Sequence, residues 1–125
     1  MKMRVGYVVL YVNDLERCLT FWVEQVGMVE RKRTAVGELA VVEIGFPGQD
    51  FSFELVPLQM MKENPDNLDL ATPSIAFRVD DLDATHERLT ANGVQVSAIT
   101  TQHGPRSFAL SDPEGRWFAV LGATD

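Results

Sequence analysis

Apolar and polar residues alternate along most of this chain in short runs, and the runs occur in the same order twice. Residues 7–16 read YVVLYVNDLE, residues 74–83 read SIAFRVDDLD, and the two segments align without a gap. Each run ends in an Asp-Leu-acidic signature and is followed by a helical pattern. Alternation with a period of two is typical of a strand with one buried face. The ordered recurrence therefore indicates a duplicated unit.

Both copies predict the element order β-α-β-β-β. In the first copy the predicted strands are 5–12, 28–34, 38–46 and 51–57, and in the second they are 74–79, 95–100, 106–111 and 116–121. Helices are predicted over 15–26 and 82–91. Asp14 precedes the first helix, where a carboxylate can accept hydrogen bonds from exposed backbone amides, and Gly27 ends it.

The duplication sets the predicted domain organisation. One domain over residues 1–125 is expected, with modules 1–58 and 73–125 joined by a polar, acidic, proline-containing connector, 59–72. A chain of 125 residues with 46% hydrophobic content is long enough to bury a core of its own.

Charge and hydropathy restrict the expected partners. The net charge of −7 opposes binding to phosphate backbones, so we expect no nucleic-acid partner. No apolar run approaches the roughly 20 residues that span a bilayer, and the first residues lead directly into a strand pattern, so a cytoplasmic protein without a membrane partner is expected. The single cysteine, Cys18, cannot form an internal disulfide and is expected to pack inertly on the first helix.

Six motifs together resemble the vicinal oxygen chelate superfamily, which includes glyoxalase I, extradiol dioxygenases, fosfomycin-resistance enzymes and bleomycin-resistance proteins. The motifs are YVVLYVNDLE from Tyr7, the pair Phe21-Trp22, the helix stop at Gly27, FEL from Phe53, FRVDDL from Phe77 and DPEG from Asp112. The resemblance covers essentially the whole chain. It implies an α+β fold in which two βαβββ modules form a curved mixed sheet with a cup-shaped cleft, and it implies that the chain pairs as a homodimer.

The resemblance also implies four positions for metal ligands, one on the first strand and one on the last strand of each copy. In the first copy these positions hold Tyr7, where His is usual, and Glu54. In the second copy they hold Ser74 and Ala119. Alanine has no donor atom and serine is a poor ligand, so three of the four positions are substituted and no metal cofactor is expected.

Two histidines lie away from these positions. His86 falls on the second predicted helix and is expected at the surface or edge. His103 falls in the loop 100–106, where with Glu54 it would only begin a metal site, because two groups are too few.

If Tyr7 faces into the cup, as the resemblance implies, period-two alternation predicts which other strand residues line it. The resulting pocket is expected to be aromatic and apolar with a few polar groups, as is common for small-molecule sites. The candidate ligand-binding residues are Tyr7, Tyr11, Glu54, Ser74, Arg78, His103 and Trp117. Alternatives remain open at this point: the tyrosines can be interface residues, Trp117 can pack in a core or dimer, and Arg78 can form a structural ion pair with Glu54.

Glu54 is the candidate catalytic residue. Desolvation in an apolar cup would disfavour its ionised form and suit it to act as a general base or ligand anchor. The alternative is a solvated or arginine-paired carboxylate.

Three functions are compatible with these residues. The favoured one is a metal-free protein that binds an apolar or cationic small molecule between aromatic walls. The second is a lyase or dioxygenase-type enzyme, with displaced metal ligands or with acid–base chemistry at Glu54 and Tyr7. The third is a structural or regulatory dimer with an empty cleft.

Overall fold

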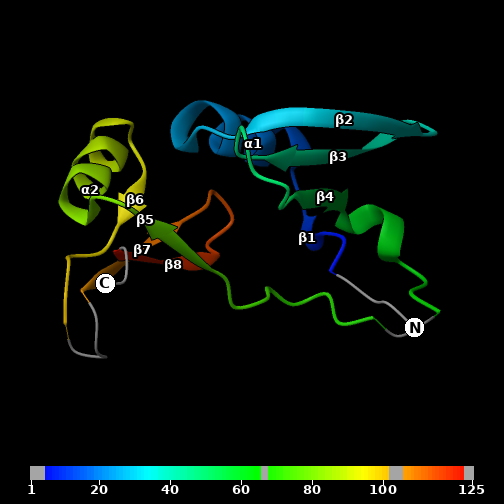
Figure 1. The fold of residues 1–125 in the computed structure, drawn as a ribbon. Coiled ribbons are helices and arrows are strands. Elements are labelled where there is room, and N and C mark those ends of the chain that lie inside the picture. The colour runs from blue at the N-terminus through cyan, green and yellow to red at the C-terminus, as the bar shows by residue number, and fades with distance from the viewer. Residues whose placement is uncertain (1–4, 66–67, 102–105, 123–125) are drawn as a thin grey trace, which may run out of the picture. The chain divides into compact units, whose positions relative to one another are not determined.

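A computed structural model describes residues 5–65, 68–101 and 106–122 (Figure 1). The chain divides into two compact units, residues 1–72 and 73–125. Each unit carries its own four-stranded mixed sheet and a helical segment, in the order β-α-β-β-β. The predicted α+β class and the two βαβββ modules are confirmed.

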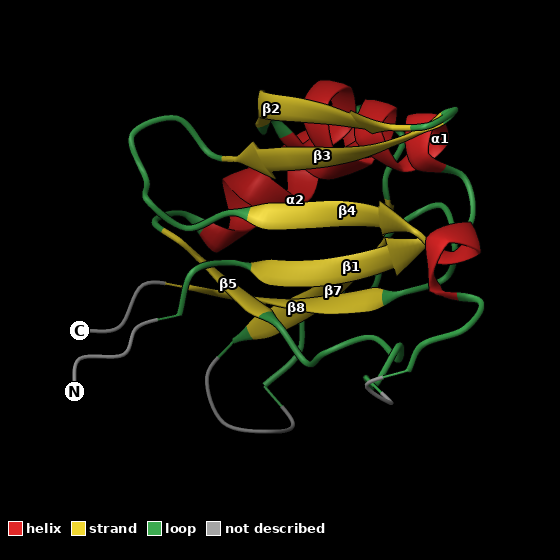
Figure 2. Cartoon of the chain, turned by 90° about the vertical axis from the view of Figure 1, so that its right-hand side faces the viewer, coloured by secondary structure: helices red, strands yellow, loops and turns green. Residues whose placement is uncertain are grey.

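Unit 1 contains the first sheet. Its strands are β1 (Val8–Val12), β2 (Val29–Val36), β3 (Leu39–Gly45) and β4 (Phe53–Pro57). They lie side by side in the order β1-β4-β3-β2, as Figure 2 shows, with β1 and β4 parallel and the other neighbours antiparallel. The helical segment between β1 and β2 consists of α1 (Leu15–Thr20) and the π-helical η1 (Phe21–Val26).

The core of unit 1 lies between this helical segment and one face of the sheet. Trp22 is fully buried and its ring meets Phe21 and Phe53 edge to face, with centroids 5.0 and 5.3 Å apart. Edge-to-face aromatic pairs add to the stabilisation that comes from burying their area. Leu10 and Leu55 are also buried and are direct neighbours across β1 and β4. The alternate residues of these strands therefore face away from the helix.

The helix predicted over 15–26 is continuous, but its second half is a π-helix. The backbone N–H of Gly27 donates to the Trp22 carbonyl oxygen at 3.1 Å, five residues back. Such wider turns are uncommon and often local. Here the π-turn accompanies burial of two adjacent aromatic residues, Phe21 and Trp22. Gly27 then adopts a left-handed φ of 106°, which explains why glycine ends the helix.

Unit 2 contains the second sheet. Its elements are β5 (Ala76–Val79), α2 (Leu82–Ala91), β6 (Gln95–Val96), β7 (Ser107–Ser111) and β8 (Trp117–Gly122). The strand order β5-β8-β7-β6 repeats that of unit 1, with β5 and β8 parallel. α2 has the predicted bounds, and Asp81 caps it by accepting a hydrogen bond from the Ala84 N–H at 3.0 Å.

The strand predicted over 95–100 is wrong beyond Val96. The Ala109 N–H donates to the Ser97 Oγ at 2.8 Å, so a side chain replaces one backbone acceptor of the ladder. A serine hydroxyl competes with backbone partners in this way. Regular pairing stops there, and only an isolated bridge between Thr100 and Ser107 follows.

The predicted connector, 59–72, begins within a short helix. The 3₁₀ helix η2 spans Leu58–Met61, directly after β4. Asn64 then accepts a hydrogen bond from the Leu68 N–H and donates one to the Leu68 carbonyl oxygen. Within the described ranges, no helix is long and apolar enough to cross a membrane.

Candidate functional site

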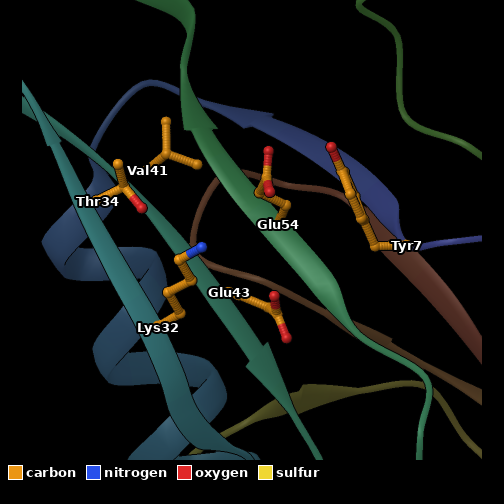
Figure 3. A pocket seen from close by; sticks show the side chains of 6 residues that line it. All are labelled: Tyr7, Lys32, Thr34, Val41, Glu43 and Glu54. Atoms are coloured by element: carbon orange, nitrogen blue, oxygen red, sulfur yellow. The ribbon is translucent and has the colours of Figure 1, made fainter.

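A hollow of about 280 Å³ lies on the sheet of unit 1, on the face that the helix leaves uncovered. Figure 3 shows six side chains that rise from this face of β2, β3 and β4 and from the residue before β1. They are Tyr7, Lys32, Thr34, Val41, Glu43 and Glu54. The volume is close to the lower end of the range for small-molecule sites.

Strand register brings the polar members of this lining together. Glu43 on β3 lies directly opposite Glu54 on β4, and Lys32 on β2 lies directly opposite Glu43. Residues opposite one another in a sheet point to the same face, with Cβ atoms about 4.5–5.5 Å apart. The two carboxylates and the ammonium group therefore share one side of the sheet.

A β-bulge in β2 turns Lys32 toward the hollow. The register of β2 with β3 shifts between Glu30 and Lys32, so Arg31 is the extra residue. Glu30 lies opposite Ile44, which is fully buried in the core, whereas Lys32 lies opposite Glu43. Without the bulge, Glu30 and Lys32 would point to the same face of the sheet, because side chains two residues apart on a strand do so.

Glu54 is the candidate site residue with the most perturbed environment. Partial burial raises the pKa of its carboxyl group, the neighbouring Glu43 raises it further, and Lys32 opposes both by lowering it. Among the described residues of unit 1, the Glu54 carboxylate has no hydrogen-bond or ion-pair partner. Glu54 is thus a carboxylate without a partner among the described residues of its own unit, and it lines the hollow.

Glu43, by contrast, is held by a hydrogen-bonded relay. The Ser52 Oγ donates to the Glu43 Oε2 at 3.1 Å, and the Arg31 Nη1 donates to the Ser52 Oγ at 2.8 Å. Arg31 also donates to the carbonyl oxygens of Phe46, Gln49 and Phe51, so its guanidinium fastens the β3–β4 loop. The relay fixes the direction in which one oxygen of Glu43 points.

Among the predicted site residues of unit 1, Tyr7 and Glu54 line the hollow together and Tyr11 does not. Tyr11 lies opposite Val56, two register positions beyond Glu54, and is half-buried. The hollow is more polar than the aromatic cup that alternation predicted. Lys32, Thr34, Val41 and Glu43 were missed, although the alternation of β3 placed Val41 and Glu43 on one face.

The predicted site residues of unit 2 lie on one exposed side of its sheet. Ser74, Arg78 and Trp117 are exposed, and 48% of the surface of Trp117 is accessible. Phe118 and Val120, which alternate with Trp117 and Ala119 along β8, are buried. The Arg78 Nη1 donates to the Gly122 carbonyl oxygen of the same unit at 3.0 Å. The alternative interpretation, in which Arg78 forms an ion pair with Glu54, stays a hypothesis. His103 lies outside the described residues.

His86 and Cys18 lie where a structural role is expected of them: His86 at the edge of unit 2 and Cys18 packed on the first helix. The His86 Nε2 forms a 2.9 Å hydrogen bond with the Ser97 carbonyl oxygen, and its ring meets Phe108 edge to face at 4.9 Å. Cys18 is fully buried on α1. A buried thiol in an apolar environment is disfavoured as a nucleophile.

The side chains at the family's ligand positions do not fit a divalent metal ion. They offer a phenol, a carboxylate, a hydroxyl group and, at Ala119, a methyl group. Lys32 also places a positive charge in the hollow beside Glu54 and lowers the pKa of the Glu54 carboxyl group. Across residues 5–65, 68–101 and 106–122, no three His, Cys, Asp or Glu side chains group as a metal site would require.

Comparisons with known proteins agree with this fold. The sequence model of the Glyoxalase/Bleomycin resistance protein/Dioxygenase superfamily matches residues 4–120. The chain is 29% identical over 119 residues to the uncharacterized protein YetH of Bacillus subtilis (strain 168), covering 94% of this chain and 96% of YetH.

Two solved structures show how widely the fold is used. TnmS3, an antibiotic binding protein from Streptomyces sp. CB03234, superposes with a TM-score of 0.79 at 24% identity, over 98% of both chains. A glyoxalase I mutant from Zea mays superposes with a TM-score of 0.74 at 22% identity, over 98% of this chain and 45% of its own. At these identities the likeness shows the fold alone, because one fold carries different activities.

Proposed function

The chain belongs to the Glyoxalase/Bleomycin resistance protein/Dioxygenase superfamily, and we propose that within it the chain is a small-molecule binding protein that works without a metal ion. The ligand is apolar or cationic and lies in the hollow of unit 1, against the ring of Tyr7 and beside the carboxylate of Glu54. Tyr11, Ser74, Arg78, His103 and Trp117 stay predicted contributors.

The observation that carries this proposal is the carboxylate of Glu54, which lines a hollow of about 280 Å³ and has no partner among the described residues of unit 1. A carboxylate that is partly withdrawn from water and has no protein partner gains from a ligand that donates a hydrogen bond or brings a positive charge. Tyr7 lies in the same lining with 48% of its surface exposed, so its ring is open to an apolar or cationic group.

The donor set supports binding without a metal ion. Tyr7, Ser74 and Ala119 occupy three of the four positions at which the resemblance implies ligands, and Lys32 adds an ammonium group to the hollow. One carboxylate at these positions is fewer than the three or four protein ligands that a catalytic ion requires.

The test combines metal analysis with a ligand screen. Protein purified without chelator is analysed for metal content, and wild type and Glu54→Ala are screened by heteronuclear NMR against small aromatic and amine compounds. We expect near-zero metal, and hits whose shifts lie around Tyr7 and disappear in Glu54→Ala while the remaining spectrum is retained. About one tightly held ion per chain, or hits that are unaffected by Glu54→Ala, would overturn the proposal.

A second candidate function is acid–base catalysis at the same site. The raised pKa of Glu54 favours it, because a carboxylate that takes up a proton more readily than usual is suited to act as a general base. The Tyr7 hydroxyl would donate to the substrate. A compound that binds to wild type is incubated with the protein and followed by NMR; turnover that is lost in Glu54→Gln, with binding retained, would establish the enzyme.

We also propose that the chain forms a homodimer. Trp117 is an exposed aromatic residue at the start of β8, and β1 and β2 are the two edges of the first sheet. Exposed apolar side chains and open sheet edges are surfaces that association covers. Light scattering after size-exclusion chromatography measures the mass, and a monomer at micromolar concentration would exclude a stable dimer.

A further inference from the structure

We propose that Glu43 is a second ligand-binding carboxylate and makes the hollow selective for ligands with a positively charged nitrogen over neutral ligands of the same shape. This inference rests on the proposed binding function and narrows its ligand class to monovalent organic cations, such as an ammonium group on a small aromatic or aliphatic body. Among the carboxylates of this hollow, the sequence analysis identified Glu54 and missed Glu43.

The first step is the placement of the two carboxylates. Glu43 and Glu54 are direct cross-strand neighbours on β3 and β4, and both line the hollow (Figure 3). Like charges at directly opposed positions destabilise a sheet. A positive charge held between them removes this repulsion, so a bound cation gains from both groups at once.

The second step is the orientation of Glu43. Its Oε2 accepts from the Ser52 hydroxyl, and Ser52 is held in turn by Arg31. Ser52 is buried and Glu43 is half-buried, so this hydrogen bond is partly shielded from water. No donor among the described residues of unit 1 contacts the Glu43 Oε1, which leaves that oxygen available to a ligand. An oriented acceptor binds a donor with a smaller loss of side-chain freedom.

The third step is the charge of the lining. Lys32 is the cation among the six lining residues, and it forms no ion pair with a described residue of unit 1. Arg33 beside it on β2 pairs with Glu16 and Glu30. Two carboxylates and one ammonium group leave one net negative charge when all are ionised. A monovalent cation balances this charge, and a divalent ion would leave an excess positive charge beside Lys32.

The fourth step is the wall beside the charges. Tyr7 contributes an aromatic ring, and Val41 contributes an apolar surface. A cation over a tyrosine ring is stabilised by the charge distribution of the ring. The lining therefore offers an ammonium ion two carboxylates, a ring and a small apolar patch.

The test compares two probes of nearly equal shape and different charge. Benzylamine, which is a cation at pH 7, and neutral benzyl alcohol are titrated into the ¹⁵N-labelled full chain at low salt, and affinities are obtained from the shifts of hollow residues. The variants are Glu43→Gln, Glu54→Gln and, as a matched control, Glu24→Gln on the exposed side of η1. Each variant is first checked for a wild-type pattern of shifts in the remaining chain.

We expect wild type to prefer benzylamine to benzyl alcohol, and Glu43→Gln to reduce this preference roughly tenfold, the size of one charge-assisted hydrogen bond. Glu24→Gln should leave the preference unchanged. If Glu43→Gln retains the preference, or if wild type binds the two probes equally or neither of them, the inference is overturned. Equal binding that still depends on Glu54 overturns this inference and leaves the proposed function standing.

Discussion

The two units share a backbone plan and differ in what they place at equivalent positions of the sheet. In unit 1 the pair across the third and last strands is Glu43 with Glu54, and in unit 2 the corresponding pair is Ala109 with Ala119. The residue before each last-strand position is a buried phenylalanine, Phe53 or Phe118. At these positions the helix-facing side of the sheet is thus alike in both units, whereas the opposite side carries two carboxylates in unit 1 and two methyl groups in unit 2.

This difference separates what the fold requires from what a site requires. The helix-facing residues must stay apolar in both copies, because their burial supplies most of the stability of each unit. The opposite face carries no such requirement. The candidate site residues accordingly lie where the copies diverge: Tyr7 aligns with Ser74, and Glu54 aligns with Ala119.

The largest expected effect tests the similarity of the two cores. Phe53→Ala and Phe118→Ala each remove a buried ring at equivalent positions, so each should lower the free energy of unfolding by about 3–5 kcal/mol. Urea denaturation followed by circular dichroism measures both. A much smaller cost for one of them would show that its unit tolerates a cavity and that the cores are not energetically equivalent.

The next effect lies in the turn before the last strand, where the units differ. Asp112 is fully buried and accepts from the Arg116 guanidinium at 2.8 Å and from the Glu114 and Arg116 backbone N–H groups. Asp112→Ala leaves the arginine without its closest partner and should cost about 3 kcal/mol.

The matched control for this turn is the exposed ion pair of Asp83 with Arg106. Asp83→Ala should cost less than about 1 kcal/mol, because an exposed pair contributes little. Denaturation of both variants under identical conditions makes the comparison. Equal costs would mean that burial of Asp112 adds nothing to its ion pair.

A third effect tests the hydrogen-bonded relay from Arg31 through Ser52 to Glu43, which unit 2 lacks at the equivalent alanine. A Cβ atom on Gly45 would lie 2.5 Å from the Arg31 Cζ and 2.8 Å from the Phe51 carbonyl oxygen. Gly45→Ala should therefore displace the guanidinium and cost about 1–3 kcal/mol. In the Arg31→Ala background the side-chain clash is absent, so the additional cost of Gly45→Ala should fall, and a double-mutant cycle measures that coupling.

Much of the fold could be predicted because local signals and tertiary packing agree. α2 has a cap at Asp81, a helical pattern and the stop Asn92-Gly93, and its bounds were predicted without error. The π-turn at Phe21 and Trp22 could not be predicted in this way, since it depends on where two adjacent rings find space in the core. The break after Val96 depends on a hydroxyl of Ser97 reaching a partner strand.

The candidate site was predictable only where alternation is undisturbed. Tyr7 and Glu54 were identified from the resemblance, and the alternation of the first and last strands of unit 1 is consistent with both facing the same side of the sheet. Lys32 does not, because the bulge at Arg31 shifts the phase of β2 in the middle of the strand. Glu43 was within reach of the same alternation, but its relay through Ser52 joins residues nine positions apart and becomes visible only in the folded chain.

The smallest effect concerns the charge of Glu54 and is measured from the pH dependence of the free energy of unfolding. Burial and the neighbouring Glu43 raise the pKa of Glu54 above its unfolded value, so the folded state holds this proton more tightly than the unfolded state. Below the unfolded pKa, Glu54 is protonated in both states and its ionisation costs nothing. As the pH rises through the unfolded and then the folded pKa, ionisation lowers the stability of wild type.

Glu54→Gln removes this penalty, so at pH 7 it should be more stable than wild type by about 0.2–1 kcal/mol, the size of a like-charge cross-strand contact. The difference should shrink toward zero at about pH 3, below the ordinary pKa of glutamate. Urea denaturation of wild type, Glu54→Gln and the control Glu24→Gln between pH 3 and 8 measures it. A Glu54→Gln variant that is less stable than wild type at neutral pH would show that the carboxylate is stabilised by its surroundings. The carboxylates of unit 1 would then be part of its fold, as the apolar face is, and the contrast with Ala109 and Ala119 of unit 2 would no longer mark a binding site.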